Sequence, residues 1–212
     1  MADTYHSNLR DDVVSFVPAC GRLLDVGGGT GVTARHLKSI GRAREVGVLD
    51  AVAPRDDPAL DFSSTIDIED HAALSEFLRA HGPFDTVLFL DVLEHLVDPW
   101  KALDVFGKYV SAGGTMIASI PNIRHISVVK DLVWRGRWEY VDAGLLDRTH
   151  LRFFVRNTAI RLMDRPGFDV EKVQAAPIHY AKHKLLDRLT FGLLREFLTL
   201  RFYVVVRKRS GV

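Results

Sequence analysis

Short apolar runs alternate with amphipathic segments along most of the 212-residue chain. The apolar positions between the runs recur at helical spacing, whereas the runs themselves have the continuous apolar character of strands buried on both faces. This alternation predicts an α/β fold with a parallel sheet, because each parallel strand needs a crossover helix. The expected strands are 22–26, 45–49, 63–67, 84–90, 115–120, 167–173 and 201–207.

Capping residues mark where several of the intervening helices begin and end. Asp98-Pro99 has the pattern of an N-cap followed by proline at the first helical position, and Gly41 is placed to end a helix. Gly113-Gly114 is expected to turn the chain into the fifth strand, which Pro121 ends. The expected helices are 6–16, 32–40, one around 74–78, 99–109 and 181–197, with an Asp- and Pro-rich loop at 54–58.

A glycine turn follows the first expected strand, in the run LLDVGGGTG from Leu23 to Gly31. Its alternating glycines give the spacing G-x-G-x-G instead of the G-x-G-x-x-G of dinucleotide sites. Asp25 precedes the first glycine, and an acidic group there suits a cationic ligand better than a pyrophosphate. A glycine turn at the carboxyl edge of a parallel sheet is where nucleotide-like cofactors bind.

This run resembles the first motif of the class I S-adenosylmethionine-dependent methyltransferases. The resemblance implies a doubly wound, Rossmann-like sheet of seven strands, mostly parallel, with the last strand antiparallel and helices on both faces. It also implies that the turn passes under the amino-acid end of S-adenosylmethionine, that Asp25 contacts that end, and that S-adenosylhomocysteine is the product. A glycine-rich turn without a ligand is the alternative. The turn residues concerned are Gly27, Gly28, Gly29 and Gly31.

Acidic residues that follow later strands extend the expected cofactor site. Asp50 ends the second strand, where doubly wound folds place the acid that binds ribose hydroxyls. Capping of the next loop is the alternative role for this carboxylate. In the resembling methyltransferases an acid and an apolar neighbour hold adenine, and Asp67 and Ile68 match that pair. Glu69 and Asp70 can instead start the following helix, where acids are favoured.

The run FDTVLFLDVLEHL at 84–96 resembles the fourth-strand motif of the same family. The resemblance implies that Asp91 and Val92 line the cofactor beside its sulfonium. It further implies that Glu94 and His95 face the cleft or stabilise the loop, and His95 is as compatible with a structural as with a catalytic role. No metal site is expected, because the resemblance assigns these side chains to the cofactor cleft.

Composition and charge narrow the setting of this chemistry. The chain is 47% hydrophobic, lacks an apolar run long enough to span a bilayer, and does not open with a signal segment. One cysteine excludes an internal disulfide, so a cytoplasmic setting is expected. Residues 1–121 hold 10 Lys and Arg against 18 Asp and Glu, and residues 122–212 hold 18 against 9. Such halves suit a cationic cofactor and an anionic acceptor, or are simply two solvated faces that attract each other.

The segment 122–154 carries the expected acceptor side. Its motifs IPN, GRWEY and LLDRTHLRFF resemble a bacterial methyltransferase subgroup associated with glycan and lipopolysaccharide biosynthesis. Tryptophan offers a stacking face and arginine a bidentate grip on anions, both useful for a sugar or a phosphate. The acceptor-binding candidates are Asn122, Arg124, Trp138 and Arg148.

Methyl transfer to a hydroxyl needs alignment of the two reacting groups and removal of a proton. His150 is the first candidate base, with Asp147 as an orienting carboxylate or second base, and with His95 and His125 in reserve. The alternative for Asp147 and His150 is a polar turn that organises its loop through the neighbouring arginines.

Together these features predict a single methyltransferase domain over residues 1–212, with acceptor-side or cap insertions at 122–154 and 177–198. The expected reaction is O-methylation of a sugar or other small molecule, with anionic and lipid-linked acceptors included. A cofactor-binding module without turnover and an NAD-dependent oxidoreductase are the alternatives. The apolar stripe and basic residues of 181–197 suit an anionic membrane surface, a sheet edge, or a second subunit in a homodimer. No nucleic-acid partner is expected.

Overall fold

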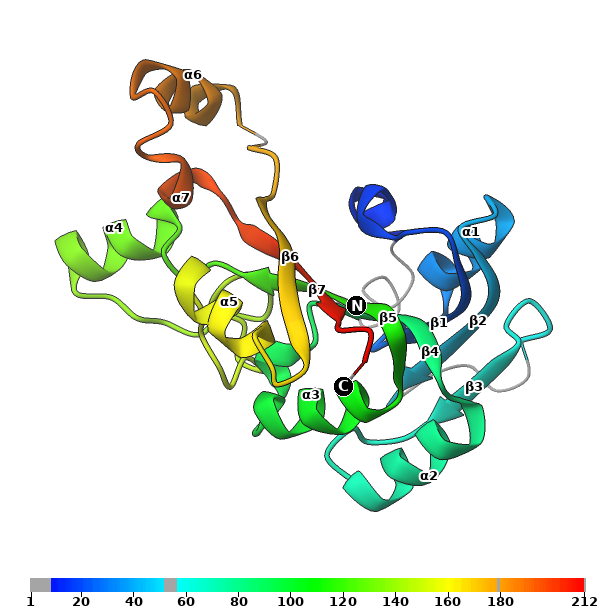
Figure 1. Ribbon diagram of the computed structural model, residues 1–212. Coiled ribbons are helices and arrows are strands. Elements are labelled where there is room, and N and C mark those ends of the chain that lie inside the picture. The colour runs from blue at the N-terminus through cyan, green and yellow to red at the C-terminus, as the bar shows by residue number, and fades with distance from the viewer. Residues whose placement is uncertain (1–8, 52–56, 179, 212) are drawn as a thin grey trace.

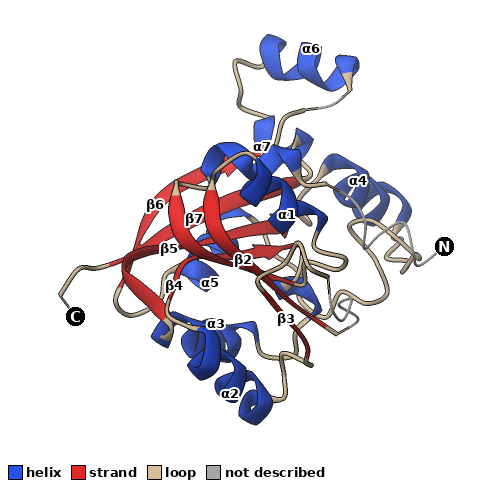
Figure 2. Ribbon diagram, turned by 90° about the vertical axis from the view of Figure 1, so that its right-hand side faces the viewer, coloured by secondary structure: helices blue, strands red, loops and turns tan. Residues whose placement is uncertain are grey.

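The computed structural model describes residues 9–51, 57–178 and 180–211, which form a seven-stranded sheet with helices on both faces (Figure 1 and Figure 2). The strand order is β3-β2-β1-β4-β5-β7-β6. β7 runs antiparallel to both of its neighbours, and the remaining pairings are parallel. The strands are β1 (Cys20–Val26), β2 (Ala43–Asp50), β3 (Phe62–Thr65), β4 (Phe84–Leu90), β5 (Val110–Pro121), β6 (Phe168–Ala175) and β7 (Arg201–Lys208).

This architecture confirms the predicted doubly wound, mostly parallel sheet with an antiparallel last strand. From β1 the chain crosses to β2 and β3 on one side and then returns to β4 and β5 on the other. The strand order therefore reverses between β1 and β4, and ligands of open α/β sheets bind in the crevice at the carboxyl ends of such strands.

Two hydrophobic cores lie on opposite faces of the sheet. One contains apolar residues of α2, α3 and α5, and the other contains those of η1 and α1. Alternate strand residues serve the two cores, as for Leu23 and Leu24 of β1. The helices are η1 (Asp11–Phe16), α1 (Val32–Ser39), α2 (His71–His81), η2 (Leu93–His95), α3 (Pro99–Lys108), α4 (Ile126–Arg135), α5 (Arg156–Met163), α6 (Ala181–Leu189) and α7 (Arg195–Leu198).

The expected capping signals hold at two helices. The Asp98 carboxylate accepts from the Lys101 amide at 3.0 Å, with Pro99 as the first residue of α3. The Asp70 carboxylate accepts from the amides of Ala72 and Ala73 at 3.1 Å, so Asp70 begins α2 as one of its expected roles. These caps satisfy amides that the first turn of a helix leaves without intrahelical partners.

Two expected elements differ from the structure. β5 begins at Val110, before Gly113-Gly114. Val110 already pairs with Phe84 of β4, and after a bulge the pairing resumes between Thr115 and Thr86. The helix expected at 181–197 breaks into α6 and α7, since Phe191 and Gly192 adopt positive φ values of 50° and 80°. That conformation cannot continue a right-handed helix.

The segment at the amino end is shorter than expected, and α4 and α5 were not expected. Of the helix predicted over 6–16, the structure has a 3-10 helix at Asp11–Phe16, and residues 6–8 lie outside the described residues. Residues 54–56 of the expected loop also lie outside them. Within the described residues, no helix has the length and apolar character needed to cross a membrane.

Candidate active site

A cavity of about 1090 Å³ opens at the carboxyl ends of β1, β2 and β4. One wall is formed by the glycine turn, Asp50, the 66–68 segment and the loop after β4. The opposite wall is formed by α4 and by the chain between Arg137 and His150. Segments far apart in the sequence thus enclose one space, large enough by the standards of ligand pockets for two small molecules.

The glycine turn forms the floor of this cavity. Gly27 has a φ of +69°, and a Cβ there would lie 2.4 Å from Cγ2 of Val92. A Cβ on Gly28 would lie 2.8 Å from the carboxyl group of Asp25. Gly27 is therefore required both by its backbone conformation and by the lack of room for a side chain. Gly28 is required by the lack of room alone.

Asp25 lies below the turn and is 2% exposed. Burial raises the pKa of its carboxyl to about 7, the positive charge of Arg10 opposes that shift, and the negative charge of Asp50 adds to it. Asp50 lies at the end of β2, and its Oδ2 accepts from the Gly29 amide at 2.8 Å. The acid that sequence reasoning assigned to ribose therefore also holds the glycine turn in place.

Asp67 and Ile68 follow β3 and line the same wall. Oδ1 of Asp67 accepts from the Glu69 amide at 2.9 Å, while Ile68 is 9% exposed and belongs to the core. Glu69 turns outward from this segment, and its Oε1 accepts from the Val97 amide at 2.7 Å. Glu69 thereby connects the segment to the loop after β4, and Asp67, Ile68 and Asp91 line the same cavity.

Asp91 follows β4 with a φ of 60°, a strained conformation for a residue with a side chain and one that clusters at functional sites. Its Oδ2 accepts from Nη1 of Arg10 and Nη1 of Arg201, each at 2.7 Å, and its Oδ1 accepts from Oγ of Ser119 at 2.7 Å. Sequence reasoning missed both arginines, which line the cavity 81 and 110 residues away in the chain. No local motif indicates such partners.

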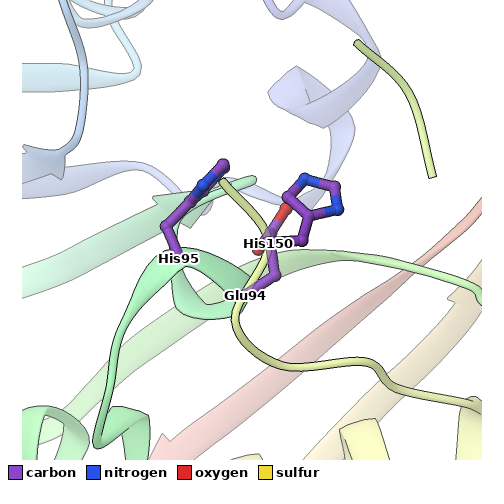
Figure 3. Close-up of side chains that lie close together, drawn as sticks. All are labelled: Glu94, His95 and His150. Carbon is purple, nitrogen blue, oxygen red and sulfur yellow. The ribbon is translucent and has the colours of Figure 1, made fainter. Parts of the chain in front are cut away.

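Glu94, His95 and His150 come together on the wall of the cavity (Figure 3). Glu94 is 1% exposed, and burial first and Asp91 second raise its pKa well above the usual range. The rings of His95 and His150 meet edge to face with centroids 4.8 Å apart. Burial, and then the neighbouring His150, lower the pKa of His95.

His150 and Asp147, which were predicted to act as a pair, each form hydrogen bonds with other residues. Nδ1 of His150 donates to the carbonyl oxygen of Leu145 at 3.2 Å, so a carbonyl and not Asp147 orients the ring by hydrogen bonding. Oδ1 of Asp147 accepts from the Thr149 amide at 2.8 Å and from the Thr149 hydroxyl at 2.7 Å. Asp147 thus organises its own turn, as in the alternative, although both residues line the cavity.

Among the described residues, Asn122 and Arg124 are not part of the cavity wall and make contacts within the scaffold, so their acceptor role stays a prediction. Asn122 is 1% exposed, and its Nδ2 donates to the carbonyl oxygens of Glu196 and Thr199 at 2.6 and 2.9 Å. The guanidinium of Arg124 stacks on Phe197, 4.2 Å from the ring centroid. Both residues attach α7 to the end of β5. His125, held in reserve as a base, begins α4 with its ring accepting from the Ser127 amide.

Trp138 and Arg148 also lie off the described cavity wall. Trp138 packs edge to face on Phe153 with centroids 5.3 Å apart, and Arg148 pairs with Asp142 at 2.6 Å. Arg137, Glu139 and Val141 line the cavity instead, whereas Trp138 and Tyr140 between them pack on Phe153.

Comparison with known proteins identifies the fold and its family. A family model for a methyltransferase domain matches residues 3–173. A ubiquinone biosynthesis O-methyltransferase of Cereibacter sphaeroides is 35% identical over 124 residues, which cover 55% of this chain and 49% of that protein. A protein of the same name from Maricaulis maris is 28% identical over 198 residues, covering 90% and 72% of the two chains. The chain thus spans about half the length of the first of these relatives.

A solved structure gives the same fold over nearly the whole chain. The S-adenosylmethionine-dependent methyltransferase of Archaeoglobus fulgidus superposes with a TM-score of 0.61 at 16% identity, over 99% of this chain and 95% of that one. At the level of the family, the domain match confirms the predicted methyltransferase, and the superposition confirms its predicted fold. The relatives are named for ubiquinone biosynthesis and not for the glycan or lipopolysaccharide subgroup that the motifs of 122–154 resemble.

Proposed function

This chain belongs to the methyltransferase domain family, and on that premise we propose that it O-methylates a small molecule with S-adenosylmethionine as the donor. The observation that carries the proposal is one continuous cavity with the glycine turn, Asp50 and Asp91 on one wall and the 137–150 chain on the other. When bound, S-adenosylmethionine supplies an electrophilic methyl group on a positively charged sulfur.

The residues of the first wall fit this donor. The turn presents backbone in place of side chains, because Cβ atoms at Gly27 and Gly28 would collide with Val92 and Asp25. Asp50 is buried at the end of β2, where a carboxylate accepts from vicinal ribose hydroxyls. Asp67 and Ile68 offer an acceptor and an apolar surface beside it, as adenine requires.

The chain contributes to methyl transfer chiefly by positioning. The two walls hold donor and acceptor against each other, and such alignment contributes about 7–11 kcal/mol in favourable intramolecular reactions. The buried loop residues Val92 and Leu96, together with Leu145 and Leu146, exclude water from the space between the walls. The acceptor hydroxyl must also lose its proton, and the titratable side chains that line the cavity include Glu94, His95 and His150.

A hydroxyl on an aromatic ring is the acceptor that the second wall supports best. Val128, Val141, Leu145 and Leu146 give this wall an apolar surface, as a flat ring would need. The relatives named ubiquinone biosynthesis O-methyltransferase support oxygen as the atom that is methylated. Arg137 adds a cationic group that can bind a ring carboxylate.

A sugar hydroxyl is the second candidate acceptor. The motifs IPN, GRWEY and LLDRTHLRFF resemble a glycan-associated subgroup, and Asp131 and Glu139 on the second wall can accept from sugar hydroxyls. The charge of the two halves of the chain, acidic before residue 122 and basic after it, supports an anionic acceptor of either kind.

Calorimetry with S-adenosylmethionine tests the donor. We expect saturable binding that Asp50→Ala weakens at least tenfold and that Glu76→Ala, an exposed acid on α2, leaves unchanged. Mass spectrometry of reactions with phenols and catechols, and separately with sugars, sugar nucleotides and lipid-linked glycans, tests the acceptor. Methylation of the first set alone supports the ring, and of the second set alone the sugar. Binding without any product would leave a cofactor-binding module.

The expected insertions have different roles within this proposal. The segment 122–154 supplies most of the acceptor wall, whereas none of the described residues of 177–198 lines the cavity. In the second segment α6 stands away from the sheet (Figure 1 and Figure 2). Its end and the following turn expose Leu189, Phe191 and Leu193 at 67%, 95% and 84%. The basic residues beside them are Lys182, Lys184 and Arg188.

An anionic membrane surface fits this exposed apolar tip and its basic flank, which suits a lipid-linked acceptor. Flotation with phosphatidylcholine vesicles, with and without 30% phosphatidylglycerol, tests this peripheral location. We expect binding to the anionic vesicles that Phe191→Ser with Leu193→Ser abolishes and that Ile40→Ser, at the exposed residue directly after α1, preserves. Failure to float, together with a dimer in light scattering that the same variant dissociates, would assign this surface to a second copy.

A further inference from the structure

The cluster of Glu94, His95 and His150 has a composition that the methyl-transfer proposal does not by itself require. Each residue offers one ligand atom, and the three atoms lie within 4.8 Å of one another (Figure 3). Two of the residues come from the η2 turn after β4, and the third comes from the turn before α5. All three line the cavity between its two walls.

Glu94 is the unusual member of the cluster. Its side chain is 1% exposed, and neither carboxylate oxygen has a hydrogen-bond partner among the described residues. A buried carboxylate without partners costs several kcal/mol in the charged form, so such groups are paired, protonated or bound to a metal. Two imidazoles lie within 4.8 Å of it, and imidazoles are a carboxylate's usual companions around a metal ion.

Hydrogen bonds fix which nitrogen each imidazole presents. Nδ1 of His95 donates to the carbonyl oxygen of Thr149 at 3.1 Å, and Nδ1 of His150 donates to that of Leu145 at 3.2 Å. A carbonyl oxygen only accepts, so Nδ1 carries the proton in both rings and Nε2 keeps its lone pair. A backbone carbonyl on the second nitrogen is the arrangement found around metal-binding histidines.

The backbone holds the two turns together without help from an ion. The amides of Leu151 and Arg152 donate to the carbonyl oxygen of Glu94 at 2.8 and 3.0 Å. The turn that carries His150 is therefore attached directly to the residue that supplies the carboxylate. A site whose ligands are fixed in this way loses little freedom when an ion binds.

We propose that Glu94, His95 and His150 bind a divalent transition-metal ion, with zinc the best match, and that the acceptor hydroxyl coordinates to it. Two imidazoles and one carboxylate suit zinc and leave a coordination position for a further ligand. This inference rests on the proposed function, and it replaces the expected absence of a metal. It also changes the expected role of His150 from base to ligand, because a coordinated lone pair cannot accept a proton.

The ion supplies the deprotonation that O-methylation needs. Coordination lowers the pKa of a bound hydroxyl, so its proton passes to water and the oxygen becomes a better nucleophile near neutral pH. That oxygen then forms its bond to the methyl carbon while the carbon–sulfur bond breaks and its electron pair goes to sulfur. Charge and atoms balance without an added oxidant or reductant.

Metal binding by the full-length chain, measured without donor or acceptor, tests the site. The chain is dialysed against a chelator, titrated calorimetrically with Zn²⁺, Mn²⁺ and Mg²⁺, and loaded with Co²⁺ for visible absorption. We expect one Zn²⁺ per chain and cobalt bands typical of low coordination number. Glu94→Gln and His150→Ala should each weaken Zn²⁺ binding by roughly 100-fold or more, beyond the loss seen for outer partners. His36→Ala, which removes an imidazole on α1, should bind Zn²⁺ as the unchanged chain does.

The outcomes separate this inference from the methyl-transfer proposal. No saturable binding, or equal affinity in the Glu94 and His150 variants with native circular dichroism, would overturn the metal site. Methyl transfer that persists after chelation would overturn the catalytic role of the ion while the proposed function stands. Zinc binding with no methylated product in any acceptor set would leave the site intact and overturn the proposed function.

Discussion

The two walls of the cavity are built in different ways. The cofactor wall forms where parallel strands end, since Asp25 and Asp50 lie in the last residues of β1 and β2 and Asp91 directly follows β4. The acceptor wall combines α4 with the irregular chain that follows it, which is attached by bonds such as that from the Leu151 amide to the Glu94 carbonyl oxygen. Strand pairing therefore positions the first wall, whereas long-range contacts between loops position the second.

The largest effect on stability is expected at the glycine turn of the cofactor wall, where there is no room for an added side chain. Gly27→Ala should lower the free energy of unfolding by about 2–4 kcal/mol, because it combines a positive φ with a Cβ that collides with Val92. It should also weaken S-adenosylmethionine binding at least tenfold. Gly41→Ala is the matched control, with a φ of +73° but no atom within 4 Å of the added Cβ. Equal destabilisation of the two in urea would show that backbone strain alone explains the requirement.

The pH dependence of stability tests the buried acid below the glycine turn. Burial, opposed by Arg10 and aided by Asp50, raises the pKa of Asp25 from 3.8 to about 7. A carboxyl group whose pKa is higher in the folded than in the unfolded chain contributes its full stabilisation below the unfolded pKa. This stabilisation is lost as the pH rises from 4 to 7. Between pH 4 and pH 8, the free energy of unfolding of Asp25→Asn should therefore rise by about 2–4 kcal/mol relative to that of the unchanged chain. A pKa unit corresponds to about 1.4 kcal/mol.

Urea unfolding at one-unit pH intervals measures this difference, and parallel curves for the two proteins would contradict it. Asp12→Asn provides a comparison of opposite sign. Burial favours the neutral form of Asp12, but hydrogen bonds from Arg10 and Tyr203 outweigh it and hold its pKa below the usual value. The stability that Asp12 contributes is present above its unfolded pKa and is lost as pH falls, so its replacement should matter least in acid.

A substitution at Asn122 distinguishes a structural role of this residue from a role in binding the acceptor. Asn122→Ala removes two donated bonds to α7 and its following turn and one accepted bond from the Arg124 amide. Because the bond to Thr199 is buried and the bond to Glu196 partly buried, we expect a loss of about 2–3 kcal/mol in unfolding free energy. Affinity for S-adenosylmethionine, measured by calorimetry, should stay the same. An unchanged stability with a raised acceptor KM would support the acceptor role expected from the sequence.

The smallest effect concerns two arginines of the acceptor segment. Arg137→Ala should raise the acceptor KM about tenfold, equal to about 1.4 kcal/mol, because its side chain lines the cavity. Arg148→Ala should change KM less than twofold, because its partner is the exposed Asp142. Steady-state kinetics with the acceptor identified by the screen measures both. The reverse ranking would mean that Arg148, and not Arg137, contacts the acceptor when it is bound.

The sequence predicted most of the sheet and the cofactor wall because the signals there are local. The apolar runs are continuous where both faces are covered, so β4 was placed at its observed bounds. Asp50 was chosen from its position at a strand end, and Asp25 and Asp67 from their match to the motifs of the resembling family; all three line the cavity. Arg10 and Arg201, which pair with Asp91, gave no signal, because their relation to it exists only after folding.

On the acceptor side the residue types were informative but their directions were not. Asn122 and Trp138 are typical binding residues, yet one holds α7 and the other packs on Phe153. The sequence did not predict the break between α6 and α7, because leucines continue at helical spacing across Phe191. The positive φ of Phe191 depends on its tertiary surroundings. Short irregular segments take their conformation from the surfaces on which they lie.

What the sequence determined by itself was the doubly wound sheet, the glycine turn and the family, because hydrophobic period and glycine spacing act over a few residues. What only the tertiary structure decided was which side chains share the cavity. Glu94 and His95 were assigned to the cleft from their motif, and His150 was proposed separately as a base. Their meeting depends on the amides of Leu151 and Arg152 binding the Glu94 carbonyl, contacts between segments more than fifty residues apart. Contacts across that separation form only when the sheet has brought the two turns to the same edge.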